Sequence, residues 1–214
     1  MRNFLRHKGL YIFLSISLLI LLTILAGLLL LGHRPSFYKD YSSLPQEELQ
    51  NRAGHFLQHL LEVASLANQG EEFQLEIQED ELNCFLAANA WQDLPGAADY
   101  LPFSGGSPQV HFLPPQSSQK ELGKIILAVK LGILPLDTVI SAHCRLSKMA
   151  QGFVIEVDEL KAGALPIPRR FFKSAISEVE RVRLENVFEE VEIEDLRLEK
   201  GWLRIVGRGR PDKE

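Results

Sequence analysis

The chain has 214 residues, enough for one folded domain with a sizeable core, and its formal net charge at pH 7 is −5. Every Asp and Glu lies after residue 39, whereas four of the 23 Lys and Arg residues lie before residue 36. The rest of the chain is therefore acidic, which argues against nucleic acid as a partner.

An uncharged apolar run of 23 residues, Leu10 to Gly32, dominates the N-terminal region. A membrane-spanning helix needs roughly 20 apolar residues to cross about 30 Å of hydrocarbon. The run therefore predicts a transmembrane helix that contacts the lipid bilayer through residues 10–32. Arg2, Arg6 and Lys8 precede it, which predicts a cytoplasmic N-terminus and an extracytoplasmic body.

A cleaved signal peptide is the alternative reading of the same run. The apolar region of a signal peptide covers about 7–15 residues and ends at a small-x-small site. This run is longer and ends in Leu28 to Leu31, which favours an uncleaved anchor. We therefore expect a cytoplasmic stub and transmembrane anchor over residues 1–35 and one extracytoplasmic domain over residues 36–214.

The first half of that domain alternates between helical and extended patterns. Apolar residues at helical spacing predict a helix from Pro45 to Gly70, with Ser43 as its N-cap. Strict alternation over Glu72 to Gln78 predicts a half-buried strand, and a second helix follows at Glu79. The segment Asp93 to Pro108 is dense in Pro and Gly and predicts a long loop.

The second half predicts antiparallel strands with short reversals. Reversals are expected at residues 132–135, 150–152 and 199–201, and a third helix at Pro168. The apolar parity shifts near Glu194 and Asp195, which predicts a bulge in the first closing strand. In the strand at 140–146 we expect Ile140, Ala142, Cys144 and Leu146 to point inward and Ser141, His143 and Arg145 outward. The fold class is α+β, with one curved antiparallel sheet packed on helices.

Catalytic and metal-binding patterns are weak. His55 and His59 stand four residues apart near Glu62, but no third ligand is identifiable, so we expect no metal site. Nucleophile-elbow, phosphate-loop and dinucleotide-binding motifs do not occur in the sequence, so we expect a non-enzymatic protein without a cofactor. Cys84 and Cys144 either form a disulfide or fill small buried positions, and the sequence leaves both open.

Two segments carry a family resemblance: FQLEIQEDELNCFLA (Phe73 to Ala87) and LKAGALPIPRRFF (Leu160 to Phe172). With one N-terminal span and antiparallel strands between these segments, the chain resembles the YpmS-like family of bacterial single-pass envelope proteins. The resemblance implies a bacterial inner-membrane location. It also implies a layout similar to the tubular lipid-binding (TULIP) domains, although fold alone does not fix function.

The resulting hypothesis is a membrane-anchored extracytoplasmic domain that binds a lipid or other apolar ligand between its sheet and helices. The alternative is a structural or assembly protein that contacts another envelope protein. For the first hypothesis, the expected ligand-binding residues are apolar and face the concave side of the sheet. They are Ile125, Leu127, Val129, Ile140, Ala142, Phe153, Ile155, Phe171, Phe172 and Ile176.

Overall fold

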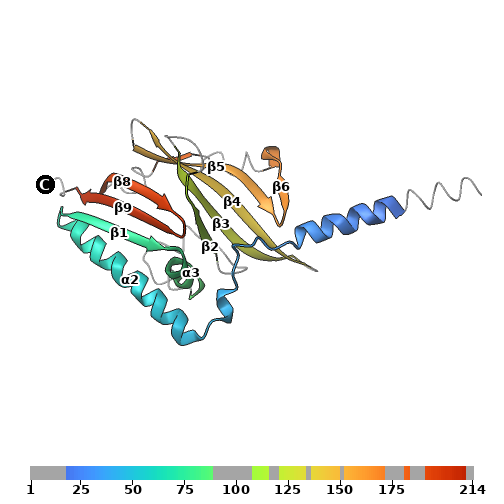
Figure 1. Cartoon of the computed structure of the whole chain (residues 1–214), viewed down its shortest axis with the longest axis horizontal. Coiled ribbons are helices and arrows are strands. Elements are labelled where there is room, and N and C mark those ends of the chain that lie inside the picture. The colour runs from blue at the N-terminus through green and yellow to red at the C-terminus, as the bar shows by residue number, and fades with distance from the viewer. Residues whose placement is uncertain are drawn as a thin grey trace, which may run out of the picture.

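The computed structural model describes residues 18–88, 108–115, 121–133, 136–149, 152–171, 181–183 and 191–210. Within them the chain folds into helices and antiparallel strands, so the α+β class and the antiparallel pairing agree with the prediction. Figure 1 shows the strands gathered in one body, from which the N-terminal helix projects.

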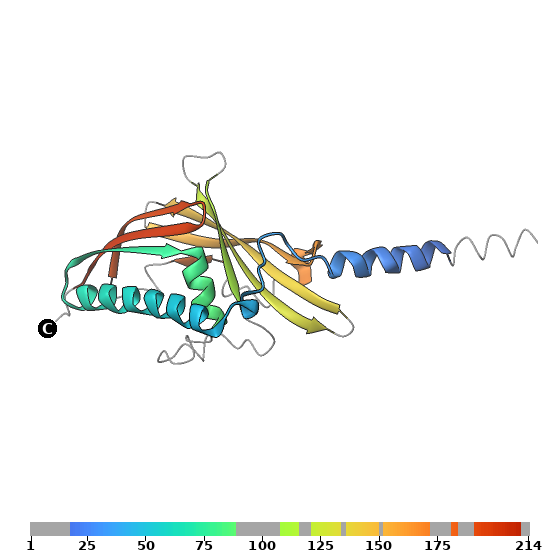
Figure 2. The same ribbon diagram turned by 60° about the horizontal axis from the view of Figure 1, so that its bottom comes forward.

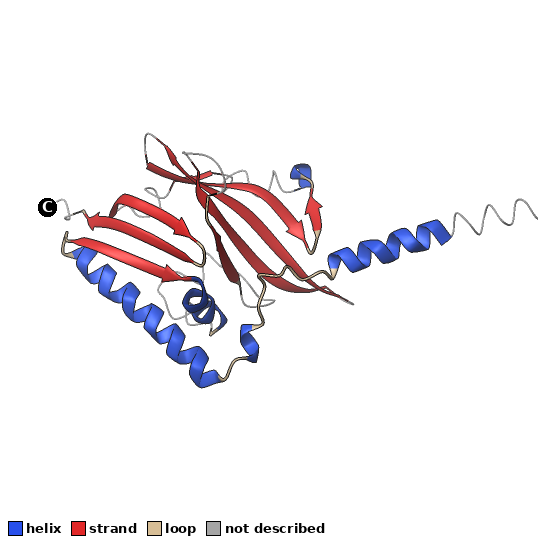
Figure 3. Cartoon of the chain, in the orientation of Figure 1, coloured by secondary structure: helices blue, strands red, loops and turns tan. Residues whose placement is uncertain are grey.

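The N-terminal half supplies most of the helical structure (Figure 3). A helix over residues 18–31 is followed by the 3-10 turn η1 (Tyr41–Ser43) and helix α2 (Gln46–Asn68). Strand β1 (Glu72–Gln78) and helix α3 (Glu79–Ala87) come next. The predicted bounds of α2, β1 and the start of α3 are therefore confirmed, but α2 begins after Pro45 without a side-chain cap, so Ser43 is not its N-cap.

The strands form two sheets instead of the single predicted sheet. The first has the order β1-β9-β8 and the second the order β2-β3-β4-β5-β6, with β7 paired to β5. Their bounds are β2 (Gln109–Leu113), β3 (Glu121–Ile133), β4 (Leu136–Met149), β5 (Gly152–Ala162), β6 (Leu165–Ile167), β7 (Arg181–Arg183), β8 (Val191–Glu199) and β9 (Trp202–Gly209).

Several local predictions hold in this arrangement. The β3–β4 and β4–β5 pairs are antiparallel, as the predicted reversals require. The register of β8 against β9 shifts between Ile193 and Asp195, where the bulge was expected. The strand β9 returns after Gly201, whose φ of 82° lies in the left-handed region that glycine adopts most easily.

The main core lies between the two sheets. Phe112, Leu146 and Phe153 of the second sheet pack against Leu196, Leu198 and Leu203 of the first, and all six are nearly inaccessible to solvent. A second cluster joins α2 to α3, where the rings of Phe56 and Phe85 lie 5.1 Å apart. Figures 1 and 2 both show α2 running alongside β1.

The predicted transmembrane anchor is wrong on this structure. No helix in the described part of the chain has both the length and the apolar character needed to cross a bilayer. The described part of this helix covers residues 18–31. Residues 10–17 of the predicted span lie outside the described ranges. The predicted single-pass inner-membrane location and the predicted bilayer contact depended on this span, and they are corrected with it.

The end of the N-terminal helix is attached to the body. The Ala164 amide donates a hydrogen bond to the Leu30 carbonyl at 2.8 Å, and Arg34 pairs with Asp137 at 3.6 Å. A side chain at Gly163 would collide with the Leu30 carbonyl oxygen, so the turn between β5 and β6 depends on glycine there. The following segment, residues 33–43, lies along the sheet and is called the strap below.

One prediction for β4 is wrong, and it concerns the sheet face on which the strap lies. Ser141 was expected to face solvent, but it is only 1% exposed. Its sheet face also carries Ile126 and His111, which pair directly across β2 and β3, and the ring of Phe37 in the strap stacks on His111. Because the strap lies over this face, both faces of the β2–β3–β4 region are covered in part.

Candidate functional site

A pocket of about 350 Å³ lies where α3 approaches strands β2, β3 and β4. Three consecutive strands and one helix contribute to its wall. The lining residues are Leu86, Pro108, Gln109, Val110, Leu127, Ala128, Val129, Ile140 and Ala142.

The sheet register aligns the side chains of the pocket wall. Val110 of β2 lies opposite Leu127 of β3, which lies opposite Ala142 of β4. One step along the same face, Val129 lies opposite Ile140. Because side chains alternate between the faces of a sheet, these five point to the same side.

The lining is apolar, and one side of the pocket is accessible. Eight of its nine residues are apolar, so it suits a ligand surface that needs no hydrogen bonds. Leu127 is 47% exposed although it belongs to the wall, which places it at the mouth. Gln109 is the one polar residue of the lining, and its side-chain amide is bound to the strap.

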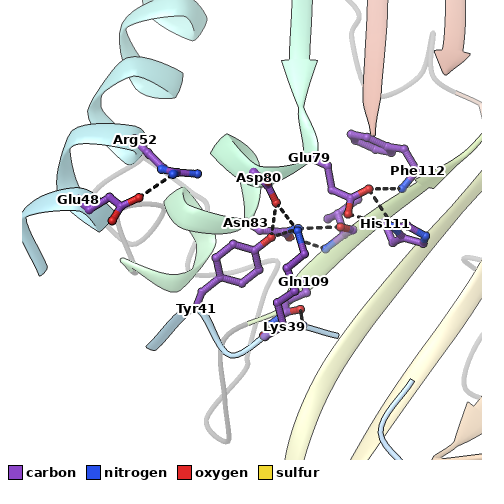
Figure 4. Close-up of polar contacts among 11 residues, drawn as sticks. Lys39, Tyr41, Glu48, Arg52, Glu79, Asp80, Asn83, Gln109, His111 and Phe112 are labelled. Atoms are coloured by element: carbon purple, nitrogen blue, oxygen red, sulfur yellow. Dashed lines mark hydrogen bonds and ion pairs between the residues drawn. The ribbon is translucent and has the colours of Figure 1, made fainter. Parts of the chain in front are cut away.

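Helix α3 holds the outer edge of β2 by side chain to backbone hydrogen bonds. The Asn83 amide donates to the Val110 carbonyl at 2.8 Å, and its oxygen accepts from the Val110 N–H at 2.7 Å. One turn earlier, the Glu79 carboxylate accepts from the Phe112 N–H at 3.0 Å and contacts His111 Nδ1 at 2.8 Å. These bonds satisfy backbone groups that an edge strand would otherwise leave unpaired. Figure 4 shows this network.

The strap contacts helix α3 through hydrogen bonds and strand β2 through an aromatic stack. Asp80 accepts hydrogen bonds from Lys39 Nζ and from the Tyr41 hydroxyl, both at 2.8 Å. The ring of Phe37 stacks on His111 with centroids 5.0 Å apart and planes within 3° of parallel. Elements far apart in sequence are therefore joined beside the pocket (Figure 4).

Gln109 joins the strap to the pocket wall. Its side-chain oxygen accepts from the Lys39 N–H at 3.1 Å, and its amide nitrogen donates to the Lys39 carbonyl. The residue is 4% exposed, so these bonds satisfy an amide that water hardly reaches.

The pKa shifts near the site follow from pairing and burial. The hydrogen bond from Lys39 lowers the pKa of the Asp80 carboxyl, and burial raises the pKa of the Tyr41 hydroxyl. Burial also raises the pKa of the Cys84 thiol and brings that of Cys144 to about 11. Both cysteines are buried free thiols, which answers the question of a bridge between them, and neither is in the reactive thiolate form at neutral pH.

The structure brings together four of the ten residues expected to bind ligand: Leu127, Val129, Ile140 and Ala142. Three others are part of the core or packed on it between the sheets: Ile125, Phe153 and Ile155. Phe171 is 65% exposed at the surface. Phe172 and Ile176 lie outside the described residues.

Five lining residues were not expected: Leu86, Pro108, Gln109, Val110 and Ala128. Leu86 lies in the helix predicted to follow Glu79, and Val110 lies in the first strand after the predicted loop, so the sequence predicted the elements that carry both residues. Their proximity depends on the docking of α3 against the β2 edge, and no local pattern in the sequence indicates it.

The earlier metal candidates lie apart from this pocket. His55 and His59 are exposed on α2, and no group of three potential metal ligands occurs among the described residues. Comparison with known proteins identified no matching family model, no matching curated protein and no matching solved structure. The resemblance to the YpmS-like family and to TULIP domains therefore stays a prediction.

Proposed function

We propose that this protein binds a lipid acyl chain or a similar apolar small ligand in the pocket between α3 and strands β2–β4, without catalysing a reaction on it. The observation that carries the proposal is the composition of the wall, with eight apolar residues around a volume of about 350 Å³. This volume falls within the range of about 300–1,000 Å³ that is usual for small-molecule sites.

The polar groups beside the pocket support the same assignment. Asn83 and Glu79 are bound to the backbone of β2, and the Gln109 amide is bound to the strap. These groups stabilise the protein and do not point to recognition of a polar ligand. The affinity then comes from removing the apolar surface of the ligand from water, at roughly 25 cal/mol per Å².

Binding of cis-parinaric acid, a fluorescent fatty acid, to the purified full-length chain tests the proposal. We expect saturable fluorescence enhancement for the wild type. Ala142→Phe should lower the affinity for the probe at least tenfold, because the ring fills the pocket. Ala64→Phe is the matched control, since Ala64 is exposed on α2, away from the pocket. Leu127→Glu provides a second variant at the half-exposed mouth, where a charge is compatible with folding.

Wild-type protein that does not bind the probe would refute the proposal and favour the alternative, an assembly protein that acts through protein contacts. Equal affinities of wild type, Ala142→Phe and Leu127→Glu would show that the probe binds elsewhere, which also refutes it. Urea unfolding of each variant separates loss of the site from loss of the fold.

A further inference from the structure

The strap and the pocket share structural elements, although they lie largely on opposite faces of the sheet. Leu127 and Ala142 face the pocket, whereas His111, which stacks on the strap, belongs to the other face of β2. Strand β2 therefore separates the two features, with the pocket on one side and Phe37 on the other.

Strand β2 is anchored in the core at Phe112, whereas its first residues depend on α3 and the strap. It has five residues, pairs with β3 and with no other strand among the described residues, and is held at its outer edge by Asn83 and Glu79 of α3. At its first residue, Gln109, the strap supplies two further hydrogen bonds. Three of the nine lining residues, Pro108, Gln109 and Val110, lie at this end.

Helix α3 is shared in the same way. Asp80, in its first turn, binds Lys39 and Tyr41 of the strap, whereas Leu86, near its C-terminus, lines the pocket. Asn83 lies between them and contacts both the Tyr41 hydroxyl, at 3.4 Å, and the backbone of β2.

We infer that the strap regulates this site: its docking on Asp80 and Gln109 fixes the β2 and α3 walls of the pocket in the geometry that binds an apolar ligand. The inference rests on the proposed function. A docked strap preorganises the wall, so the ligand does not have to order it on binding. When the strap leaves, the Gln109 amide loses both Lys39 partners, and the start of β2 is held by fewer bonds.

Thermodynamic linkage makes the effect reciprocal. If a docked strap raises ligand affinity by a given factor, the ligand must favour the docked strap by the same factor. Ligand binding should therefore slow hydrogen exchange of the strap amides, although the ligand does not have to touch the strap.

The test combines hydrogen exchange with cis-parinaric acid titration of the full-length chain. We expect Asp80→Asn to speed exchange of strap amides and to raise the Kd of the probe at least threefold, since it removes the charge that holds Lys39. Asp195→Asn is the matched control, because Asp195 also forms an ion pair, with Arg197 of β8, but is not part of the pocket lining or of the contacts made by the strap. In wild type, the probe should slow strap exchange by a similar factor.

A double-mutant cycle tests whether the strap affects ligand affinity through its hydrogen bonds with Gln109. Gln109→Met keeps the length of the side chain but removes both bonds to Lys39. We expect it to weaken probe binding, and Asp80→Asn should add little in that background. Faster strap exchange in Asp80→Asn with an unchanged Kd would overturn the inference and leave the proposed function intact. Unchanged exchange in that variant would also overturn it, because Asp80 would not hold the strap. Failure of the wild type to bind the probe would refute the proposed function itself.

Discussion

Replacing Asn83 by leucine should lower the free energy of unfolding, because it removes two hydrogen bonds that join helix α3 to strand β2. Asn83 is 2% exposed and forms two hydrogen bonds with Val110, donating to the carbonyl at 2.8 Å and accepting from the N–H at 2.7 Å. Leucine has a similar volume but no polar atom, so both backbone groups of β2 lose their partner.

The magnitude follows from the cost of unsatisfied polar groups. Each such group costs about 1–3 kcal/mol when water cannot replace the lost partner. Val110 is half-buried, so water recovers part of the loss, and we expect the free energy of unfolding to fall by about 2–3 kcal/mol for the pair.

Urea unfolding followed by far-UV circular dichroism measures this change, with an unchanged denaturant slope as evidence that the native state is preserved. Asn51→Leu is the matched control, because Asn51 is exposed on α2 and should change stability by no more than about 0.5 kcal/mol. A loss of less than about 0.5 kcal/mol for Asn83→Leu would show that α3 does not hold the β2 edge as described.

Three further predictions concern the core, the thiols and pH. Leu196→Ala should cost about 2–5 kcal/mol in urea unfolding because Leu196 is 2% exposed between the sheets, whereas Leu61→Ala, at a site 60% exposed, should cost no more than about 0.5 kcal/mol; similar losses would contradict the assigned core. Cys84 and Cys144 should react with Ellman's reagent only after unfolding, and rapid reaction of the native protein would refute their burial. Burial lowers the pKa of His143 from its ordinary value of 6.5, so below that pH the unfolded chain binds a proton that the folded chain binds less readily. The free energy of unfolding should therefore fall as pH drops through 6.5, and His143→Gln should flatten the profile; an identical profile in the variant would rule out this contribution.

The local features of the fold could be predicted because they depend on residues close in sequence. Alternation over Glu72–Gln78 gave β1 with its bounds, and the parity shift beside Glu194 gave the bulge in β8. Which surfaces become covered is decided by distant segments, as Ser141 illustrates. Its neighbours in β4 suggested a solvent-facing side chain, but the strap, about 100 residues earlier in the chain, lies over that face.

The N-terminal run is the largest disagreement between sequence and structure. Its composition predicted a helix long enough to span a membrane, whereas no helix among the described residues has both the length and the apolar character to do so. Ten large apolar side chains between Leu18 and Leu30 are 40–68% exposed, which is unusual for the surface of a folded protein. The apolar composition of the run was therefore not sufficient to predict a membrane-spanning helix.

The pocket lies on one face of the second sheet, next to the part of that face on which the first sheet packs. On this face of β3, Ile125 packs into the core beneath the β1-β9-β8 sheet, and Leu127, two residues further, is 47% exposed. Beyond Ile125 this face borders the pocket, which Leu86 of α3 lines together with Val129 and Ala142. The same apolar face is thus a packed core at one end and a pocket at the other. The alternation of apolar residues in the sequence predicted this face, but the boundary between core and pocket depends on how far the first sheet extends and on how α3 holds the β2 edge. This is why residues chosen by parity alone divide between the two environments.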